Sequence, residues 1–222
     1  MQMRPELIVM LTNKDHTVPD APEVFARCRD TKAKFWGFKE DGLPLPRMQA
    51  LSAAMREAGK TTFLEVVTYT PEESRRGARM AAACGVDYLM GTMYDPEVMA
   101  LCRDEGIQYL PFVGRVRGRP SILEGSLEEM LDQASAALEA GAWGIDLLGY
   151  RWVGDAAWHN REFTARVPAP VVLAGSINSR IRLDEVKAAG PWAFTIGSAF
   201  FRGDFGPDIP AQIDLVWDYM QT

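Results

Sequence analysis

The sequence contains little cysteine, histidine or lysine, and each shortage limits the chemistry open to the protein. The three cysteines, Cys28, Cys84 and Cys102, are odd in number and fall in helix-like segments. They are predicted to be reduced core thiols rather than disulfide or metal partners. The two histidines, His16 and His159, show no metal-ligand spacing, and no Cys/His/Asp cluster indicates zinc. A metal site built on these residues is therefore not expected.

Long hydrophobic runs and an excess of positive charge are also missing. No segment approaches the roughly 18 to 20 apolar residues that a membrane span needs. The apolar run at residues 6–11 is short enough to be a strand, and no small-residue cleavage site follows it. The net charge of −6 argues against binding to nucleic acid, although a pocket can still hold a small anion. The sequence predicts a cytoplasmic protein with neither a membrane nor a nucleic acid as a partner.

What the chain does contain is a regular alternation of short β-like runs and amphipathic helical segments. Eight strands and eight following helices in 222 residues predict an α/β fold, a single (β/α)8 TIM barrel that spans residues 1–222 as one domain. A doubly wound open sheet would normally carry a Gly-x-Gly-x-x-Gly turn after an early strand, and the chain has none. The predicted strands begin at Glu6, Lys34, Thr61, Val86, Ile107, Trp143, Pro170 and Trp192.

Capping residues mark the predicted helix boundaries. Thr70 and Asp95, each followed by proline, open two helices, and Ser126 with Glu129 forms a capping box at the start of a third. The last helix is expected from about Asp208 to the end of the chain. Five of the predicted helices end at a glycine: Gly59, Gly85, Gly106, Gly141 and Gly190.

Two consecutive predicted strands end in the same Gly-Ser pair. Gly175-Ser176 follows the seventh strand and Gly197-Ser198 follows the eighth. Barrels of this kind often form a phosphate site after strands 7 and 8. Glycine lets backbone N–H groups approach an anion, a serine hydroxyl adds a donor, and the following helix amino termini add partial positive charge. We therefore expect both pairs to bind phosphate, although either alone would also be explained as a strand-to-helix turn.

The same region resembles two families of phosphate-binding barrels. Residues 173–179, "LAGSINS", are similar to the Ala-Glu-Gly-Arg-Ile-Asn-Thr pattern of the N-acetylmannosamine-6-phosphate 2-epimerases, whose acidic residue falls on Ala174 here. Residues 173–176 are similar to the Leu-Ala-Gly-Gly of the glycerol-uptake-operon antiterminator proteins. "GFKED" at 37–41 and "LLGY" at 147–150 add likenesses to the epimerases. The resemblance implies a phosphate-binding (β/α)8 barrel with a small phosphorylated metabolite as its partner.

Lys39 is the lysine best placed for chemistry. Of the six lysines, only Lys14 and Lys39 lie at carboxyl ends of predicted strands. Strand alternation puts Trp36 and Phe38 on one face and Lys39 on the other, so Lys39 is expected to point into the barrel mouth. A partly desolvated lysine there can have a lowered pKa and act as a base or a Schiff-base amine, or it can simply hold an anion.

Two acidic residues, Glu65 and Asp146, interrupt predicted strands that are otherwise apolar. A carboxylate in such a strand is costly unless it is paired, hydrogen-bonded or neutral. Because separate strands can bring both groups together only inside a barrel, we expect them to converge there, paired with a lysine or an arginine. With Lys39 they would supply the acid and base groups for proton transfer next to a carbonyl. The alternative is a structural ion-pair layer that fills the barrel.

Four further residues at predicted strand ends are candidates for substrate binding. Asn13 and Lys14 follow the first strand, Arg115 follows the fifth, and Arg151 follows the sixth. The arginines would clamp a carboxylate or a second anionic group. The basic segment at residues 115–126 is predicted to be either a mobile lid over an anionic ligand or a solvated loop.

These features predict an enzyme that acts on a small phosphorylated sugar or keto acid by proton transfer or carbon–carbon cleavage next to a carbonyl. It would be an isomerase, an epimerase or an aldolase-type lyase. A non-catalytic regulator of the antiterminator type, which senses a phosphorylated metabolite, is the alternative. No cofactor is expected, but a flavin nucleotide bound through its phosphate stays open, as does Mg²⁺ held by Asp15, Glu65 or Asp146. Aromatics such as Trp152 and Trp158 would line a homo-oligomer interface or pack the outer helices.

Overall fold

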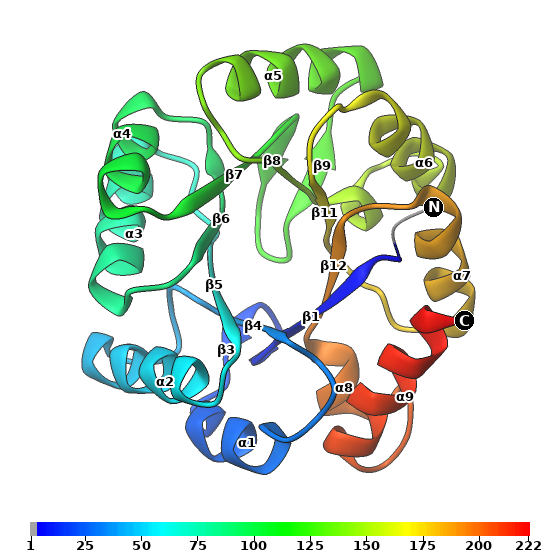
Figure 1. Cartoon of the computed structure of the whole chain (residues 1–222). Coiled ribbons are helices and arrows are strands. Elements are labelled where there is room, and N and C mark those ends of the chain that lie inside the picture. Colours follow the sequence, from blue (N-terminus) through cyan, green and yellow to red (C-terminus); the bar gives the residue numbers. More distant parts are fainter. Residues whose placement is uncertain (1–3) are drawn as a thin grey trace.

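A computed structural model describes residues 4–222 as a closed barrel of eight parallel strands (Figure 1). Around the barrel the strand order is β1-β12-β11-β10-β7-β6-β5-β4, so the last barrel strand in sequence closes on the first. The predicted (β/α)8 fold is confirmed. The barrel strands are β1 (Glu6–Met10), β4 (Phe35–Lys39), β5 (Thr61–Val66), β6 (Tyr88–Met93), β7 (Gln108–Phe112), β10 (Ile145–Leu147), β11 (Val171–Leu173) and β12 (Ala193–Ile196).

The helices form an outer ring around the strands (Figure 1). Thr70 and Asp95 cap α3 and α4 as predicted, and both hydrogen bonds of the capping box between Ser126 and Glu129 start α5. Within residues 4–222, no helix is both long and apolar enough to cross a bilayer. The helices are α1 (Ala21–Cys28), α2 (Leu45–Glu57), α3 (Pro71–Cys84), α4 (Pro96–Glu105), α5 (Leu127–Glu139), α6 (Ala156–Arg166), α7 (Arg180–Ala189), α8 (Ser198–Arg202), α9 (Ile209–Gln221) and the 3-10 turn η1 (Gly149–Arg151).

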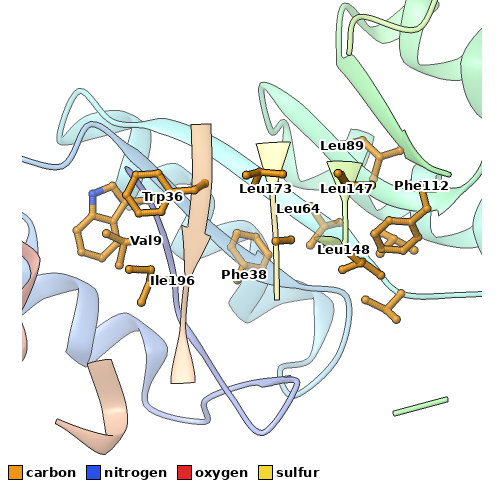
Figure 2. Packing of buried hydrophobic residues seen from close by; sticks show 14 of the residues in the cluster. Val9, Trp36, Phe38, Leu64, Leu89, Phe112, Leu147, Leu148, Leu173 and Ile196 are labelled. Atoms are coloured by element: carbon orange, nitrogen blue, oxygen red, sulfur yellow. The ribbon is translucent and has the colours of Figure 1, made fainter. Parts of the chain in front are cut away.

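Side chains alternate along each strand between the barrel interior and the helices. Trp36 and Phe38 of β4 are fully buried in the main core outside the barrel, on the face that the alternation predicted; Figure 2 shows them with residues of other strands, such as Leu64 and Leu173. Burying such a side chain stabilises the fold by about 1.5–3 kcal/mol, so the outward faces hold the helices in place. A second cluster fills the barrel itself and contains Ile8, Met10, Phe63, Met90, Leu110, Val172 and Ala193.

Aromatic rings close the amino-terminal end of the barrel. Phe63 and Tyr88 stack with their centroids 4.5 Å apart, and Trp143 meets Trp192 edge-to-face at 4.8 Å. Offset and edge-to-face pairs of this kind add stability beyond their buried area. Because the rings occupy one end, polar interior side chains are concentrated at the other end, where the strands finish.

Two antiparallel hairpins follow carboxyl ends of barrel strands. After β1, the strands β2 (Thr12–Asn13) and β3 (His16–Thr17) pair around a two-residue turn. After β7, β8 (Arg115–Arg117) and β9 (Ile122–Glu124) form the second hairpin. The segment 115–126, predicted to be a mobile lid or a solvated loop, is mostly a paired hairpin. The sequence concealed it because three-residue strands are too short to show alternation.

Candidate active site

A cavity of about 590 Å³ opens at the carboxyl ends of the barrel strands. Its walls come from β1 and the β2–β3 turn, from β4 and β5, from the tip of the β8–β9 hairpin, and from the segments that follow β10, β11 and β12. This is the end at which (β/α)8 barrels bind their ligands.

Lys39 lies in this cavity between two carboxylates. Its Nζ is 3.1 Å from Oδ1 of Asp15 and 3.6 Å from Oε1 of Glu65. The register of β4 and β5 places Lys39 opposite Glu65, so the barrel itself sets this contact. Thr17 fixes the lysine backbone, because its hydroxyl accepts from Lys39 N–H at 2.8 Å and donates to Lys39 C=O at 3.0 Å. The structure therefore puts Lys39 in the barrel mouth, where strand alternation predicted it.

The surroundings of Lys39 keep it charged. Burial alone lowers the pKa of this lysine, but attraction to Glu65 and Asp15 outweighs burial and raises the pKa above its ordinary value. A raised pKa keeps Lys39 an ammonium ion at neutral pH, which favours the alternative in which it holds an anion over a role as a base or a Schiff-base amine. Burial raises the pKa of Glu65, whereas the effect of burial on Asp15 is overcome by Lys39, which lowers the Asp15 pKa. Within residues 4–222, no group of three or more His, Cys, Asp or Glu side chains is arranged to hold a metal ion.

Asp146 lies in the barrel interior without lining the cavity. It is fully buried, and neither carboxyl oxygen has a hydrogen-bond partner among residues 4–222. Burial raises its pKa well above the ordinary value; repulsion from Glu65 adds to this effect, and attraction to Lys39 opposes it. A buried carboxyl group without a partner is held in its neutral form. The two acids converge inside the barrel as expected, but only Glu65 reaches the cavity, and the structure gives Asp146 no direct contact with a ligand there.

The β2–β3 turn holds two residues in an unfavourable backbone conformation. Lys14 and Asp15 have φ angles of +50° and +65°, in the left-handed region that lysine rarely adopts. They are the two central residues of the turn, where Asn-Gly is the usual choice. This conformation brings Asp15 to Lys39, and the N–H of Lys14 donates to Ser198 Oγ at 3.0 Å. Non-glycine residues strained in this way cluster at functional sites.

Replacing Lys14 by asparagine is expected to raise the free energy of unfolding by about 0.5 to 1 kcal/mol, because asparagine tolerates the left-handed conformation better. Urea unfolding followed by circular dichroism measures the change. The matched control is Lys34→Asn at an exposed lysine before β4 that has no positive φ, and no gain is expected there. Equal free energies for the two variants would show that the turn carries no strain.

Both Gly-Ser pairs line the same cavity. Gly175 has a φ of +90°, and a Cβ there would lie 2.7 Å from Cγ of Arg151. A Cβ on Gly197 would lie 2.3 Å from Oγ1 of Thr12. Non-bonded atoms do not approach this closely, so a Cβ at either place would force a neighbouring group to shift. Both glycines line the cavity where phosphate binding was predicted.

The two pairs differ in the helix that follows. Helix α8 begins at Ser198, directly after its glycine, so the N–H groups of its first turn lie close to the pair. Helix α7 begins only at Arg180, and the side chain of Ser179 already accepts one of its first N–H groups. The helix-terminal charge that the sequence suggested for both turns is therefore adjacent to only one of them.

Cationic side chains border the cavity beside these pairs. Lys14 and Arg151 line it, and neither makes an ion pair within residues 4–222. Arg202 of α8 also lines it and pairs with Asp204. Two cations without an internal partner, next to open backbone donors, suit an anionic ligand.

Two of the residues predicted to bind substrate do not line the cavity. Asn13 lies in β2, just before the turn. The side chain of Arg115 is 66% exposed and lies 3.5 Å from Glu129. Arg115 lies outside the cavity because the chain continues from this residue as strand β8, which brings the hairpin tip at Pro120 and Ser121 to the cavity instead.

Several cavity residues carried little or no signal in the sequence. Thr195 is a polar residue in the buried strand β12, so the reasoning applied to Glu65 would have found it. Asn178 and Asp204 lie in irregular segments and Arg202 ends the short helix α8, and the path of these segments cannot be derived from alternation. Their place in the wall depends on how the segments after β11 and β12 fold.

No protein-family model and no curated protein matches the sequence, but many solved structures match its shape. A structure described as native KDPGal has a TM-score of 0.68 at 17% identity and covers 100% of this chain and 98% of its own. Orotidine 5'-phosphate decarboxylase from Pyrococcus horikoshii OT3 gives 0.72 at 16% identity, over 97% of this chain and 99% of its own. A glycerol uptake operon antiterminator regulatory protein from Listeria monocytogenes gives 0.61 at 13% identity, over 88% and 93%.

These likenesses agree with the barrel described above. The resemblance to the antiterminator proteins, seen in the sequence at residues 173–176, extends to the whole fold. Identities this low show a shared fold and leave the activity open. By its architecture the chain is a (β/α)8 barrel, similar to enzymes and to a regulatory protein alike.

Proposed function

We propose that the protein is an enzyme that transfers a proton next to a carbonyl group in a small phosphorylated sugar or keto acid. One observation carries this proposal: a single cavity holds both the Gly175 and Gly197 turns and the cluster of Lys39, Asp15 and Glu65. The turns suit a phosphate group, and the cluster suits acid–base chemistry. The likeness in shape to orotidine 5'-phosphate decarboxylase supports an enzyme and does not select a substrate.

The phosphate group of the substrate would lie against the two Gly-Ser pairs. Backbone N–H groups of the turns and the hydroxyl groups of Ser176 and Ser198 would donate to its oxygens. Lys14 and Arg151 would balance its charge, since neither is committed to an internal ion pair. The carbonyl end of the substrate would then extend toward Lys39.

Proton transfer would use Glu65 as the base and Lys39 as the electrostatic stabiliser. Glu65 Oε1 accepts the proton from the carbon next to the carbonyl, and the electron pair of the broken C–H bond moves onto the carbonyl oxygen as an enolate. The raised pKa of Glu65 brings it closer to neutral pH and makes it a better base. The Lys39 ammonium donates to the enolate oxygen, and Asp15 holds the ammonium in place. Return of the proton from Glu65 to the neighbouring carbon, with a proton moving from the hydroxyl oxygen to the former carbonyl oxygen, completes an isomerisation; an epimerisation would need a second acid on the opposite face.

Aldol cleavage through an imine fits the site less well. An imine forms from a neutral amine, and the raised pKa of Lys39 opposes loss of its proton. The sixth barrel strand, β10, carries Asp146 and no lysine. A ligand-sensing regulator is the second candidate, because the antiterminator protein of Listeria monocytogenes has a similar shape. Such a regulator would bind phosphate without proton transfer.

The phosphate site is tested with Gly175→Ala and inorganic phosphate. The variant is expected to bind phosphate at least about tenfold more weakly by calorimetry, because losing one hydrogen bond to a charged group costs about 1.5–3 kcal/mol. Gly59→Ala is the matched control: Gly59 has a similar φ of +71°, with nothing within 4 Å of the added Cβ. The control carries the same positive-φ strain without the close contact, and it should keep its phosphate affinity. Equal phosphate affinity in both variants would contradict the site.

The chemistry is tested with the wild-type protein in deuterium oxide. A panel of phosphorylated keto sugars and keto acids is incubated with the protein and followed by proton NMR. Deuterium entering the carbon next to the carbonyl supports the proposal. Phosphate binding without exchange or turnover across the panel would favour the regulator.

A further inference from the structure

The β8–β9 hairpin is fastened on two sides of the cavity. At its base, the indole N–H of Trp152 donates to the C=O of Gly125 at 3.0 Å, and Leu123 bridges to Trp152. Trp152 directly follows Arg151, which lines the cavity. At the tip, Ser121 lines the cavity as well. The hairpin, green in Figure 1, therefore extends from the segment after β10 toward the ends of β4 and β5.

Arg119 fastens the tip on the far side. Its guanidinium donates to Glu40 at 2.5 Å, to Asp41, and to the backbone C=O of Val67 at 3.2 Å. Glu40 and Asp41 directly follow Lys39 in the chain, and Val67 directly follows β5. The planar guanidinium suits this arrangement, because it can donate to several acceptors at once.

The tip covers the end of the cavity that holds the reactive cluster. Tyr69, which follows β5, donates its hydroxyl to the C=O of Gly118 at 2.8 Å and lies 3.1 Å from the hydroxyl of Ser121. Lys39 and Glu65 line the cavity, yet they are only 5% and 6% exposed. Charged side chains that line an open cavity of this size and are so little exposed must be covered by another part of the chain, and the hairpin tip lines the same cavity.

We propose that Arg119 is a positioning residue for a lid: its contacts with Glu40, Asp41 and Val67 hold the hairpin over the reactive cluster, and a ligand enters and leaves when they break. The passage of a ligand under the lid rests on the proposed function, whereas the contacts of Arg119 that hold the hairpin are a property of the ligand-free protein. A closed lid excludes water, which strengthens the hold of Lys39 on developing negative charge. Arg119 also forms ion pairs with Glu40 and Asp41, which follow Lys39 in the chain, and an open lid breaks these pairs.

Hydrogen exchange of the ligand-free full chain tests the fastening. In Arg119→Met, the backbone amides of residues 115–124 are expected to exchange at least about tenfold faster than in the wild type, while those of α5 keep their rates. Arg117→Met is the matched control, because Arg117 lies in the same hairpin and, among residues 4–222, forms its ion pair with Glu124 alone. Its exposed pair contributes little, so a change below about threefold is expected. Unchanged exchange in Arg119→Met, or equal acceleration in both variants, would overturn the proposal.

The rate of exchange between bound and free inorganic phosphate gives a second measurement, which a purely structural role of Arg119 would not change. By ³¹P NMR, Arg119→Met is expected to bind and release phosphate faster than the wild type, with a change in Kd that is smaller than the change in either rate. Arg119→Lys is expected to restore part of the slow exchange. Faster amide exchange with unchanged phosphate rates would overturn the lid. A wild-type protein that binds no phosphate would contradict the proposed phosphate site, and the amide exchange would still decide the fastening.

Discussion

Lys39→Met is expected to slow deuterium exchange into the substrate by about 100- to 1000-fold. The loss follows from removing the donor that faces the enolate oxygen in a shielded site, where one such donor contributes this much to the rate. The variant also leaves the Asp15 carboxylate, 3.1 Å from Nζ in the wild type, without its nearest cation. Proton NMR in deuterium oxide measures the exchange rate with whichever substrate of the panel the wild type accepts.

A folded control separates this effect from a general loss of structure. Lys60→Met removes a half-buried lysine that donates to Thr31 C=O and Ala33 C=O at 2.9 Å and does not line the cavity. It is expected to keep the wild-type exchange rate. Lys39→Met should still bind inorganic phosphate, which shows that the barrel and the phosphate turns are intact.

Borohydride trapping of the wild-type protein decides whether Lys39 acts as an ammonium ion or forms an imine with the substrate. The wild-type protein with its substrate and sodium borohydride is expected to show no covalent label, since a protonated amine does not condense with a carbonyl. A label on Lys39 would contradict the ammonium mechanism and establish imine chemistry. Wild-type exchange in Lys39→Met would contradict any role for Lys39 in the reaction.

The strands and most helices could be predicted because their signals are local. Alternation along β4 is set by four or five consecutive residues, so the inward direction of Lys39 follows from the sequence. Glycine and capping residues act within one helical turn, which is why the starts of α3, α4 and α5 agree with the prediction. Barrel closure then brings the carboxyl ends of the strands together without further information.

The charge state of the site and the path of its loops could not be predicted in this way. The pKa of Lys39 depends on Asp15 and Glu65, which come from two other segments, and attraction to them reverses the effect of burial. The position of Arg115 after a predicted strand suggested a place in the site, but the hairpin that follows β7 brings Pro120 and Ser121 to the cavity instead. These features depend on contacts between residues far apart in the chain.

Asp146 provides the clearest expected effect of pH on stability. The raised pKa of its carboxyl group means that, above the unfolded value of about 3.9, the native state keeps a proton that the unfolded chain has lost. In that window the free energy of unfolding falls by about 1.4 kcal/mol for each pH unit until the native pKa is reached. Asp146→Asn cannot lose this proton, so the variant should match the wild type near pH 4 and become more stable than it as the pH rises.

Urea unfolding at a series of pH values between about 4 and 8 measures the difference in free energy between Asp146→Asn and the wild type. Taking this difference cancels the contributions of Glu65 and Asp15, which are present in both proteins. Asp132→Asn, at an exposed carboxyl of α5, is the control and should give a difference independent of pH. A flat difference for Asp146→Asn as well would mean that its carboxyl is ionised in the native barrel, and that Lys39 is shared among three carboxylates instead of two.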